Sequence, residues 1–193
     1  MGTKISDLTA LTGADSATGD VFPVVDVSAG TAGTKKMTRA ELYEALRLAA
    51  PGARVVAAGA TLSVTAALHG DKIIALDTLA GSVCTLPVAT GSGNVYTFIT
   101  KVLATSNSHI IKVANASGLM AGVIVTGDNA DGSATAFATT ATSDTITLNR
   151  TTTGSVRIGG DRIVLTDIDT NIYSVSGCCI GTGGEASPFS ATV

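Results

Sequence analysis

Short stretches in which hydrophobic and polar residues alternate dominate the chain from residue 54 onward. The alternation has a period of two in residues 61–65, 144–149 and 172–176, which is typical of strands with one buried face. Short β-branched runs bounded by Gly, Asn, Asp or Ser make up the rest of the pattern: residues 71–76, 95–99, 109–113, 122–125 and 162–165. Many short strands separated by turn signals predict a β-sandwich or barrel.

Two further features of this region narrow the architecture. No helical pattern of the kind that joins parallel strands lies between the runs, which argues against a parallel α/β sheet. No repeat of fixed period is present, which argues against a solenoid or propeller. The predicted fold is therefore all-β, an antiparallel, jelly-roll-like sandwich or barrel with an N-terminal extended arm and one short helix.

That helix is predicted directly before the β-rich region. Thr38 and Glu41 have the spacing of a capping box, in which each side chain bonds the backbone amide of the other residue. Pro51-Gly52 ends the helix. One face of it is apolar: Leu42, Ala45, Leu46 and Ala49. At about 12 residues such a helix is marginal alone, so this face must dock on another surface.

Residues 1–37 are rich in turn-forming residues and are predicted to form an irregular arm. They contain one short apolar run, residues 21–25, whose central Pro23 favours an edge strand or an extended segment laid on another surface. We expect interaction residues in this run and on the helix: Val21, Phe22, Val24, Val25, Leu42 and Leu46. The alternative is that the run packs on the core of its own chain.

The charged residues indicate a domain boundary. Residues 1–54 hold six of the 12 Lys and Arg residues and six of the 15 Asp and Glu residues. The composition changes near Pro51-Gly52, so we expect an attachment region at 1–53 and a β-rich body at 54–193. Charged residues make up 14% of the chain, against about 25% in ordinary soluble proteins. This deficit predicts a surface covered by other subunits, although a compact Thr- and Ser-rich monomer is the alternative.

Candidate chemistry is sparse. His69 and His109 lack metal-ligand neighbours at a useful spacing, and Cys178-Cys179 lacks the gap of a zinc or redox motif. Asp167 and Asp169 would share one strand face and could hold a cation or share a proton, but turn-forming aspartates are the preferred interpretation. We therefore expect no enzyme, no catalytic residue, no cofactor and no metal.

The same sequence excludes several partners and places. The net charge is −3 without a basic run, so nucleic acid is not expected as a partner. No run of 18 apolar residues and no signal peptide is present, so we expect no membrane contact and synthesis in a reducing cytoplasm with free thiols.

Three N-terminal segments resemble the start of many tailed-bacteriophage virion proteins, tail fibres among them: residues 4–8, 19–26 and 35–42. In the β-rich remainder, residues 86–93 and 143–154 are similar to phage head-decoration (cement) proteins. Tail-fibre chains usually continue well beyond this length, so the resemblance favours decoration over a fibre.

This resemblance implies a non-enzymatic structural protein on the capsid exterior, often a homotrimer, that binds across subunits of the major capsid protein. A tail-fibre or tail-adaptor component is one alternative. A carbohydrate-binding β-sandwich is another, although it should show exposed aromatic residues, and the chain has four Phe, three Tyr and no Trp.

Overall fold

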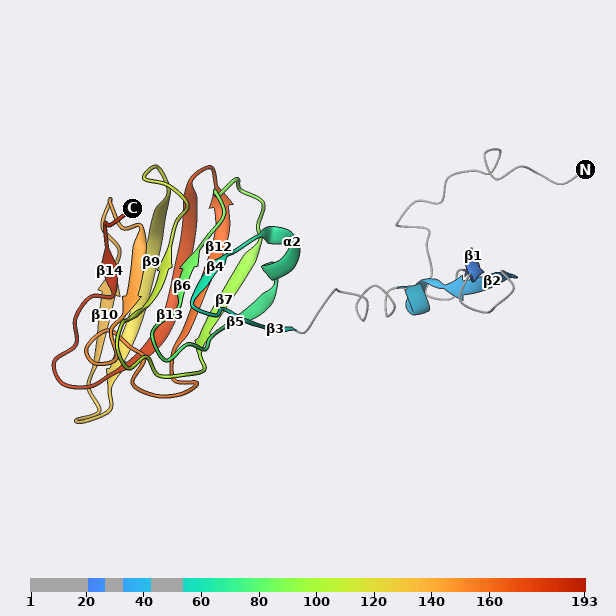
Figure 1. Ribbon diagram of the computed structural model, residues 1–193. Coiled ribbons are helices and arrows are strands. Elements are labelled where there is room, and N and C mark those ends of the chain that lie inside the picture. Colours follow the sequence, from blue (N-terminus) through green and yellow to red (C-terminus); the bar gives the residue numbers. More distant parts are fainter. Residues whose placement is uncertain (1–20, 27–32, 43–53) are drawn as a thin grey trace, which may run out of the picture. The chain divides into compact units, whose positions relative to one another are not determined.

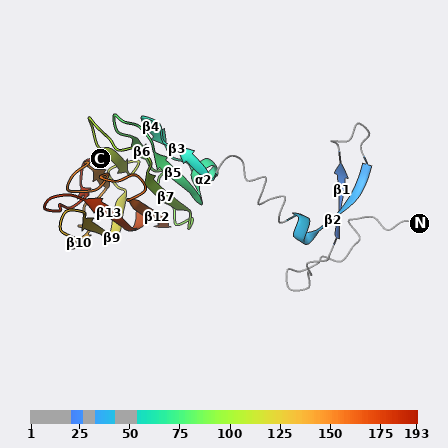
Figure 2. The ribbon, with the colours of Figure 1, turned by 90° about the horizontal axis from the view of Figure 1, so that it is seen from below.

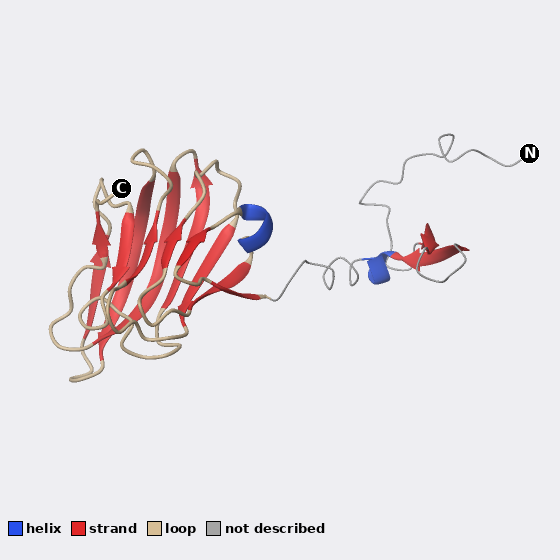
Figure 3. Cartoon of the chain, in the orientation of Figure 1, coloured by secondary structure: helices blue, strands red, loops and turns tan. Residues whose placement is uncertain are grey.

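The computed structural model describes residues 21–26, 33–42 and 54–193 (Figure 1). The chain divides into two compact units, Met1–Gly52 and Ala53–Val193. In the second unit nearly all regular structure is β-strand (Figure 3).

The first unit contains a β-hairpin followed by the start of a helix. Strand β1 (Val21–Asp26) pairs antiparallel with β2 (Gly33–Thr38), and Pro23 lies opposite Lys36. Both strands are edges of this two-stranded sheet, the setting in which a strand tolerates proline. Residues 39–42 are helical, and the rest of the predicted helix lies outside the described residues. The arm is therefore not irregular throughout: β2 was missed because its sequence, GTKKMT, is mostly polar and does not alternate.

The second unit consists of two sheets. The larger has seven strands, in the spatial order β10 (Ala134–Ala138), β9 (Leu119–Asp128), β13 (Ile172–Gly181), β12 (Arg162–Asp169), β7 (Val95–Thr100), β5 (Lys72–Leu76) and β3 (Val55–Ala57). The smaller has five, in the order β14 (Phe189–Ser190), β11 (Thr145–Leu148), β8 (His109–Lys112), β6 (Val83–Thr85) and β4 (Thr61–Ser63).

Both sheets are mixed, so the predicted antiparallel, jelly-roll-like arrangement is wrong, whereas the all-β class holds. Parallel pairs join β3 to β5, β5 to β7 and β9 to β13 in the larger sheet, and β4 to β6 and β6 to β8 in the smaller one. The remaining pairs are antiparallel.

Alternation of the chain between the sheets explains four of the five parallel pairs, those among β3 to β8. From β3 to β8 each successive strand enters the other sheet, so β3, β5 and β7 lie in the larger sheet and β4, β6 and β8 in the smaller one. Parallel neighbours need a crossover connection. Here a strand of the opposite sheet supplies that crossover, so these parallel neighbours form without a long crossover helix.

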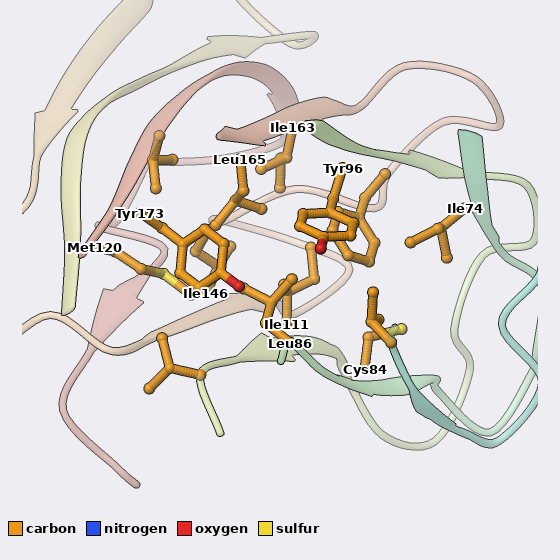
Figure 4. Packing of buried hydrophobic residues seen from close by; sticks show 14 of the residues in the cluster. Ile74, Cys84, Leu86, Tyr96, Ile111, Met120, Ile146, Ile163, Leu165 and Tyr173 are labelled. Carbon is orange, nitrogen blue, oxygen red and sulfur yellow. The ribbon is translucent and has the colours of Figure 1, made fainter. Parts of the chain in front are cut away.

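One hydrophobic core lies between the two sheets. The larger sheet contributes Tyr96, Phe98 and Tyr173, and the smaller contributes Ile111 and Ile146, all almost fully buried (Figure 4). Figure 2 shows the ribbons of the two sheets from below. The rings of Tyr96 and Tyr173 meet edge to face with centroids 6.3 Å apart, a favourable arrangement of aromatic pairs. Both sheets thus bury their inner faces against each other.

A four-residue helix, α2 (Ala66–His69), connects β4 to β5 and lies next to β5 (Figure 1). It was not predicted, because four residues are too few to show a helical period. Its last residue, His69, is buried, and the Thr65 amide donates to His69 Nδ1 at 2.9 Å. The histidine thus closes its own helical turn.

Candidate interaction surfaces

The start of the helix in the first unit is fixed by the predicted capping box. The Thr38 amide donates to Glu41 Oε2 at 2.7 Å, and the Glu41 amide donates to Thr38 Oγ1 at 3.1 Å. These hydrogen bonds from Thr38 lower the pKa of Glu41. The chain direction after β2 is therefore set by a reciprocal pair of hydrogen bonds.

The predicted interaction residues of the first unit lie on this hairpin and helix. Val21 opens β1 with 54% of its surface exposed, and Leu42 is half-buried. Phe22, Val24 and Val25 lie within β1. Leu46 lies outside the described residues. Among the described residues the hairpin has two strands, so each strand has one edge that pairs with no other described strand, and such an edge is a site for pairing with a partner.

The body carries a second candidate surface on the outside of the larger sheet. Strand residues alternate between faces, so the residues next to those in the core point away from it. The registers align them in two rows, each with one residue per strand from β3 to β10. The first row is Val55, Ile73, Thr97, Val164, Ser176, Val123 and Ala138; the second is Ala57, Ala75, Ile99, Arg162, Cys178, Val125 and Ala136. We call these two rows the seven-strand face.

The seven-strand face is unusually apolar for an exposed surface. Val55, Val123 and Val125 are 49%, 44% and 41% exposed. Among the residues of its two rows, all within the described body, Arg162 alone is charged. A sheet with one face on the core and one in water normally alternates between apolar and polar residues. Apolar residues on both sides make this face a candidate interaction surface.

An apolar groove of about 250 Å³ lies at one end of this face. Its lining includes Val55, Ile73, Ala75 and Ile99, together with Ile158 from the loop before β12. Ile158 is largely exposed. The groove thus extends the seven-strand face at its β3 edge.

The outside of the smaller sheet has a different character. Its outward positions are Thr61, Val83, Ile110 and Thr147 in one row, and Ser63, Thr85, Lys112, Thr145 and Ser190 in the next. Hydroxyl side chains dominate these rows, which we call the five-strand face. The two outer faces of the body are therefore chemically distinct.

Asp167 fastens a loop to the end of β12. Its Oδ1 accepts the amides of Thr90 and Gly91 at 2.9 and 2.6 Å, and its Oδ2 accepts the Ser92 hydroxyl at 2.6 Å. Burial alone would raise the pKa of Asp167, but hydrogen bonds from Ser92, Gly91 and Thr90 outweigh it and hold the pKa below its usual value. The charged carboxylate is thus the form that holds the loop.

Asp169 does not join Asp167 in a common site. A register shift between the two residues interrupts the alternation of β12. Asp169 is exposed, and its Oδ1 accepts the amide of Thr170 at 2.7 Å in the turn before Asn171. Asn171 has a φ of 62°, a left-handed conformation that asparagine tolerates better than most residues. The interpretation as a turn-forming residue is therefore confirmed for Asp169 and wrong for Asp167, which holds the 90–92 loop instead.

Asp161 likewise fastens a loop. It accepts the Thr100 hydroxyl at 2.6 Å, the Ser155 amide at 2.7 Å and the Ile180 amide at 2.9 Å. Burial raises the pKa of Asp161, although these hydrogen bonds act in the opposite direction. The loop before β12 is thereby tied to β7 and β13.

Asp144 ties down the C-terminal residues. It accepts the Thr145 hydroxyl at 2.7 Å and the amides of Thr192 and Val193 at 2.9 and 3.2 Å. Burial would raise its pKa, but hydrogen bonds from Thr192, Thr145 and Val193 lower it overall.

His109 is fully buried with both ring nitrogens bonded. Its Nδ1 accepts the Ser82 amide at 2.9 Å, so the proton resides on Nε2, which donates to the Val102 carbonyl at 2.8 Å. This fixes the neutral imidazole between two backbone groups. The ring thereby links the backbone at Ser82 to the backbone at Val102.

The three thiols are free and differ in exposure. Cys84 and Cys179 are buried, whereas Cys178 is exposed on the seven-strand face. Burial and nearby Asp77 raise the pKa of Cys84 to about 12. Cys178 and Cys179 are adjacent in β13 and therefore point to opposite faces of the sheet. Within the described residues, His, Cys, Asp and Glu side chains form no group of three able to hold a metal.

The aromatic residues of the body offer no exposed ring. Tyr96, Phe98 and Tyr173 are buried in the core, and Phe137 and Phe189 are half-buried. A sugar-binding surface would normally present aromatic faces to solvent.

Among the described parts of the chain, no helix is long and apolar enough to cross a membrane.

Comparison with known proteins finds no family model, no curated protein and no solved structure that matches this chain.

Sequence reasoning missed the seven-strand face, although a signal for it was present. Residues 73–76 and 122–125 are apolar or glycine throughout rather than alternating. A strand of this composition is typical of a sheet covered on both sides.

Proposed function

We propose that this protein is a non-enzymatic structural protein of a tailed-bacteriophage virion, which decorates and stabilises the capsid by binding across capsid subunits. The observation that carries the proposal is the division of the chain into a small unit, whose strand β1 begins with the exposed Val21, and a separate β-body. Its buried carboxylates and histidines fasten loops. The sequence resemblance to phage virion segments supplies the class of particle.

In this proposal the first unit attaches to the major capsid protein. Strand β1 supplies free backbone groups for pairing with an exposed strand of the capsid. Val21, Phe22, Val24 and Val25 supply apolar contact, and Leu42 and Leu46 dock the helix. Burying one such side chain contributes about 1.5–3 kcal/mol before the cost of ordering.

In this proposal the body is a rigid domain on the capsid exterior. Mixed sheets around one core and loops held by buried carboxylates give it rigidity without any reacting group. The 29 Thr residues favour extended strands. The proposed role requires no cofactor, nucleic acid or membrane, and the chain is made in the host cytoplasm before it joins the virion.

Electron microscopy of virions that carry this chain tests the location. An antibody fragment against the body marks its position, and the proposal predicts label distributed over the capsid lattice. Label confined to the tail would instead identify a tail-fibre or tail-adaptor component, and particles without label would contradict a virion role.

A further inference from the structure

We propose that the seven-strand face is a self-association surface, covered in the working protein by a second copy of this chain. This inference concerns the body alone and stands independently of the attachment of the first unit to a capsid. Its starting point is an exposed sheet face with aliphatic residues on most of its strands and one charged residue in two rows.

The whole outer surface of the seven-stranded sheet, whose middle the two rows occupy, is large enough for a stable contact. Seven strands about 4.8 Å apart make a face about 30 Å wide, and strands of about six or seven residues make it about 22 Å long. Each copy therefore offers roughly 700 Å², and two copies bury roughly 1,400 Å², within the range of about 1,200–2,000 Å² for stable interfaces.

The chemistry of the face fits another copy better than a charged partner. Arg162 is the first residue of β12 and so lies at the end of its strand, where its long stem can carry the guanidinium to the rim. The rest of both rows is aliphatic or small and uncharged. A second flat, uncharged sheet face can cover these residues without burying an unpaired charge, as one sheet covers the other inside a β-sandwich.

The distribution of charge over the body also favours association through the seven-strand face. Four of its acidic residues, Asp128, Asp144, Asp161 and Asp167, are buried, so they do not protect the surface against association. The five-strand face is rich in hydroxyl groups and contains Lys112. Of the two outer sheet faces, the seven-strand face is thus the one that water solvates less well.

Cys178 makes the contact measurable in the unmodified chain. It lies in the second row between Arg162 and Val125, and its thiol is exposed in the single copy. Cys84 and Cys179 are buried and serve as internal controls. Covering the face should slow the reaction of Cys178 with a maleimide and leave the other two thiols unreactive.

The test compares the full chain at about 1 µM and about 100 µM, which brackets contacts with micromolar dissociation constants. Sedimentation velocity gives the assembly state, and mass spectrometry gives maleimide labelling of Cys178. We expect a dimer at the higher concentration, because the same face is buried on both copies, with labelling of Cys178 slowed at least tenfold relative to the unfolded chain.

Matched variants locate the contact. Val123→Asp places a charge on an exposed position of the seven-strand face, and Ser63→Asp places the same charge on an exposed position of the five-strand face. We expect Val123→Asp to weaken association at least tenfold and restore fast labelling, whereas Ser63→Asp behaves as the unmodified chain. Ala136→Glu, on the exposed edge strand β10, provides a second variant if Val123→Asp does not fold.

The proposal is overturned by a chain that stays monomeric at the higher concentration. It is equally overturned by an oligomer in which Cys178 still reacts rapidly with maleimide. A third contradicting result would be that the Val123→Asp and Ala136→Glu variants fold and still associate as the unmodified chain does.

Discussion

Single carboxylates hold the loops of the body, and the best-connected of them is Asp167. Three consecutive residues, Thr90 to Ser92, donate hydrogen bonds to it from a loop about 75 residues earlier in the chain. Nothing in the local sequence of β12 distinguishes this aspartate from its exposed neighbour Asp169. The partner loop is brought to it by the fold, so sequence reasoning could not separate the two.

We predict that Asp167→Asn lowers the free energy of unfolding by about 1–3 kcal/mol at neutral pH, because buried donors lose a charged acceptor. The folded-state pKa of Asp167 lies below its usual value of 3.8. Its contribution is therefore present above the unfolded pKa and is lost as the pH falls through the lowered folded pKa. Urea unfolding between about pH 7 and about pH 3 should show less acid destabilisation in the variant.

Asp169→Asn is the matched control for this prediction. Asp169 is exposed and accepts one local amide, so its replacement should change stability by less than about 0.5 kcal/mol. Equal effects of the two substitutions would contradict the fastening role assigned to Asp167.

The two core tyrosines provide a second comparison of single residues. The Tyr173 hydroxyl donates to the Pro87 carbonyl at 2.9 Å, whereas the buried Tyr96 hydroxyl has no hydrogen-bond partner in the described protein. An unpaired buried hydroxyl costs free energy. We predict that Tyr96→Phe leaves stability unchanged or raises it, and that Tyr173→Phe lowers it by about 1 kcal/mol. Thermal unfolding measures the stability of both variants. A larger loss of stability in Tyr96→Phe than in Tyr173→Phe would contradict these hydrogen-bond assignments.

At the scale of elements, the start of the first-unit helix was predictable because its signal is local. Thr38 and Glu41 are three residues apart, and their reciprocal bonds form within a single turn. The pairing of strands was not predictable in the same way. Parallel contacts such as β3 with β5 depend on the chain visiting the opposite sheet in between, which alternation within one strand does not encode.

We predict that Thr38→Ala destabilises the helix start by about 1 kcal/mol through loss of the cap. Amide exchange in residues 40–42 should then accelerate about fivefold, since local opening becomes easier. Thr38→Ser keeps the hydroxyl and should retain most of the protection. Identical exchange in the alanine variant and the unmodified chain would show that the capping box does not stabilise this turn.

At the scale of the whole molecule, the all-β class could be predicted from the periodicity of the sequence. The apolar character of the outer surface of the larger sheet was not predicted. The residues of the core cluster, from Ala58 to Cys179, and the half-buried Phe189 against it belong to the second unit. Removing residues 1–52 should therefore leave the unfolding of the body nearly unchanged. The attachment role of residues 1–53 stays a prediction, and it is the central claim of the proposed function.

Co-sedimentation with undecorated capsids tests that claim most directly. The full chain is compared with the 53–193 fragment and with Val21→Asp, and Val88→Asp, at a 48% exposed valine of the body, is the control. We predict that the full chain and Val88→Asp bind. The fragment should stay in the supernatant, and Val21→Asp should bind at least about tenfold more weakly, given about 1.5–3 kcal/mol per buried side chain. A folded 53–193 fragment that saturates the capsids as the full chain does would contradict attachment through the first unit.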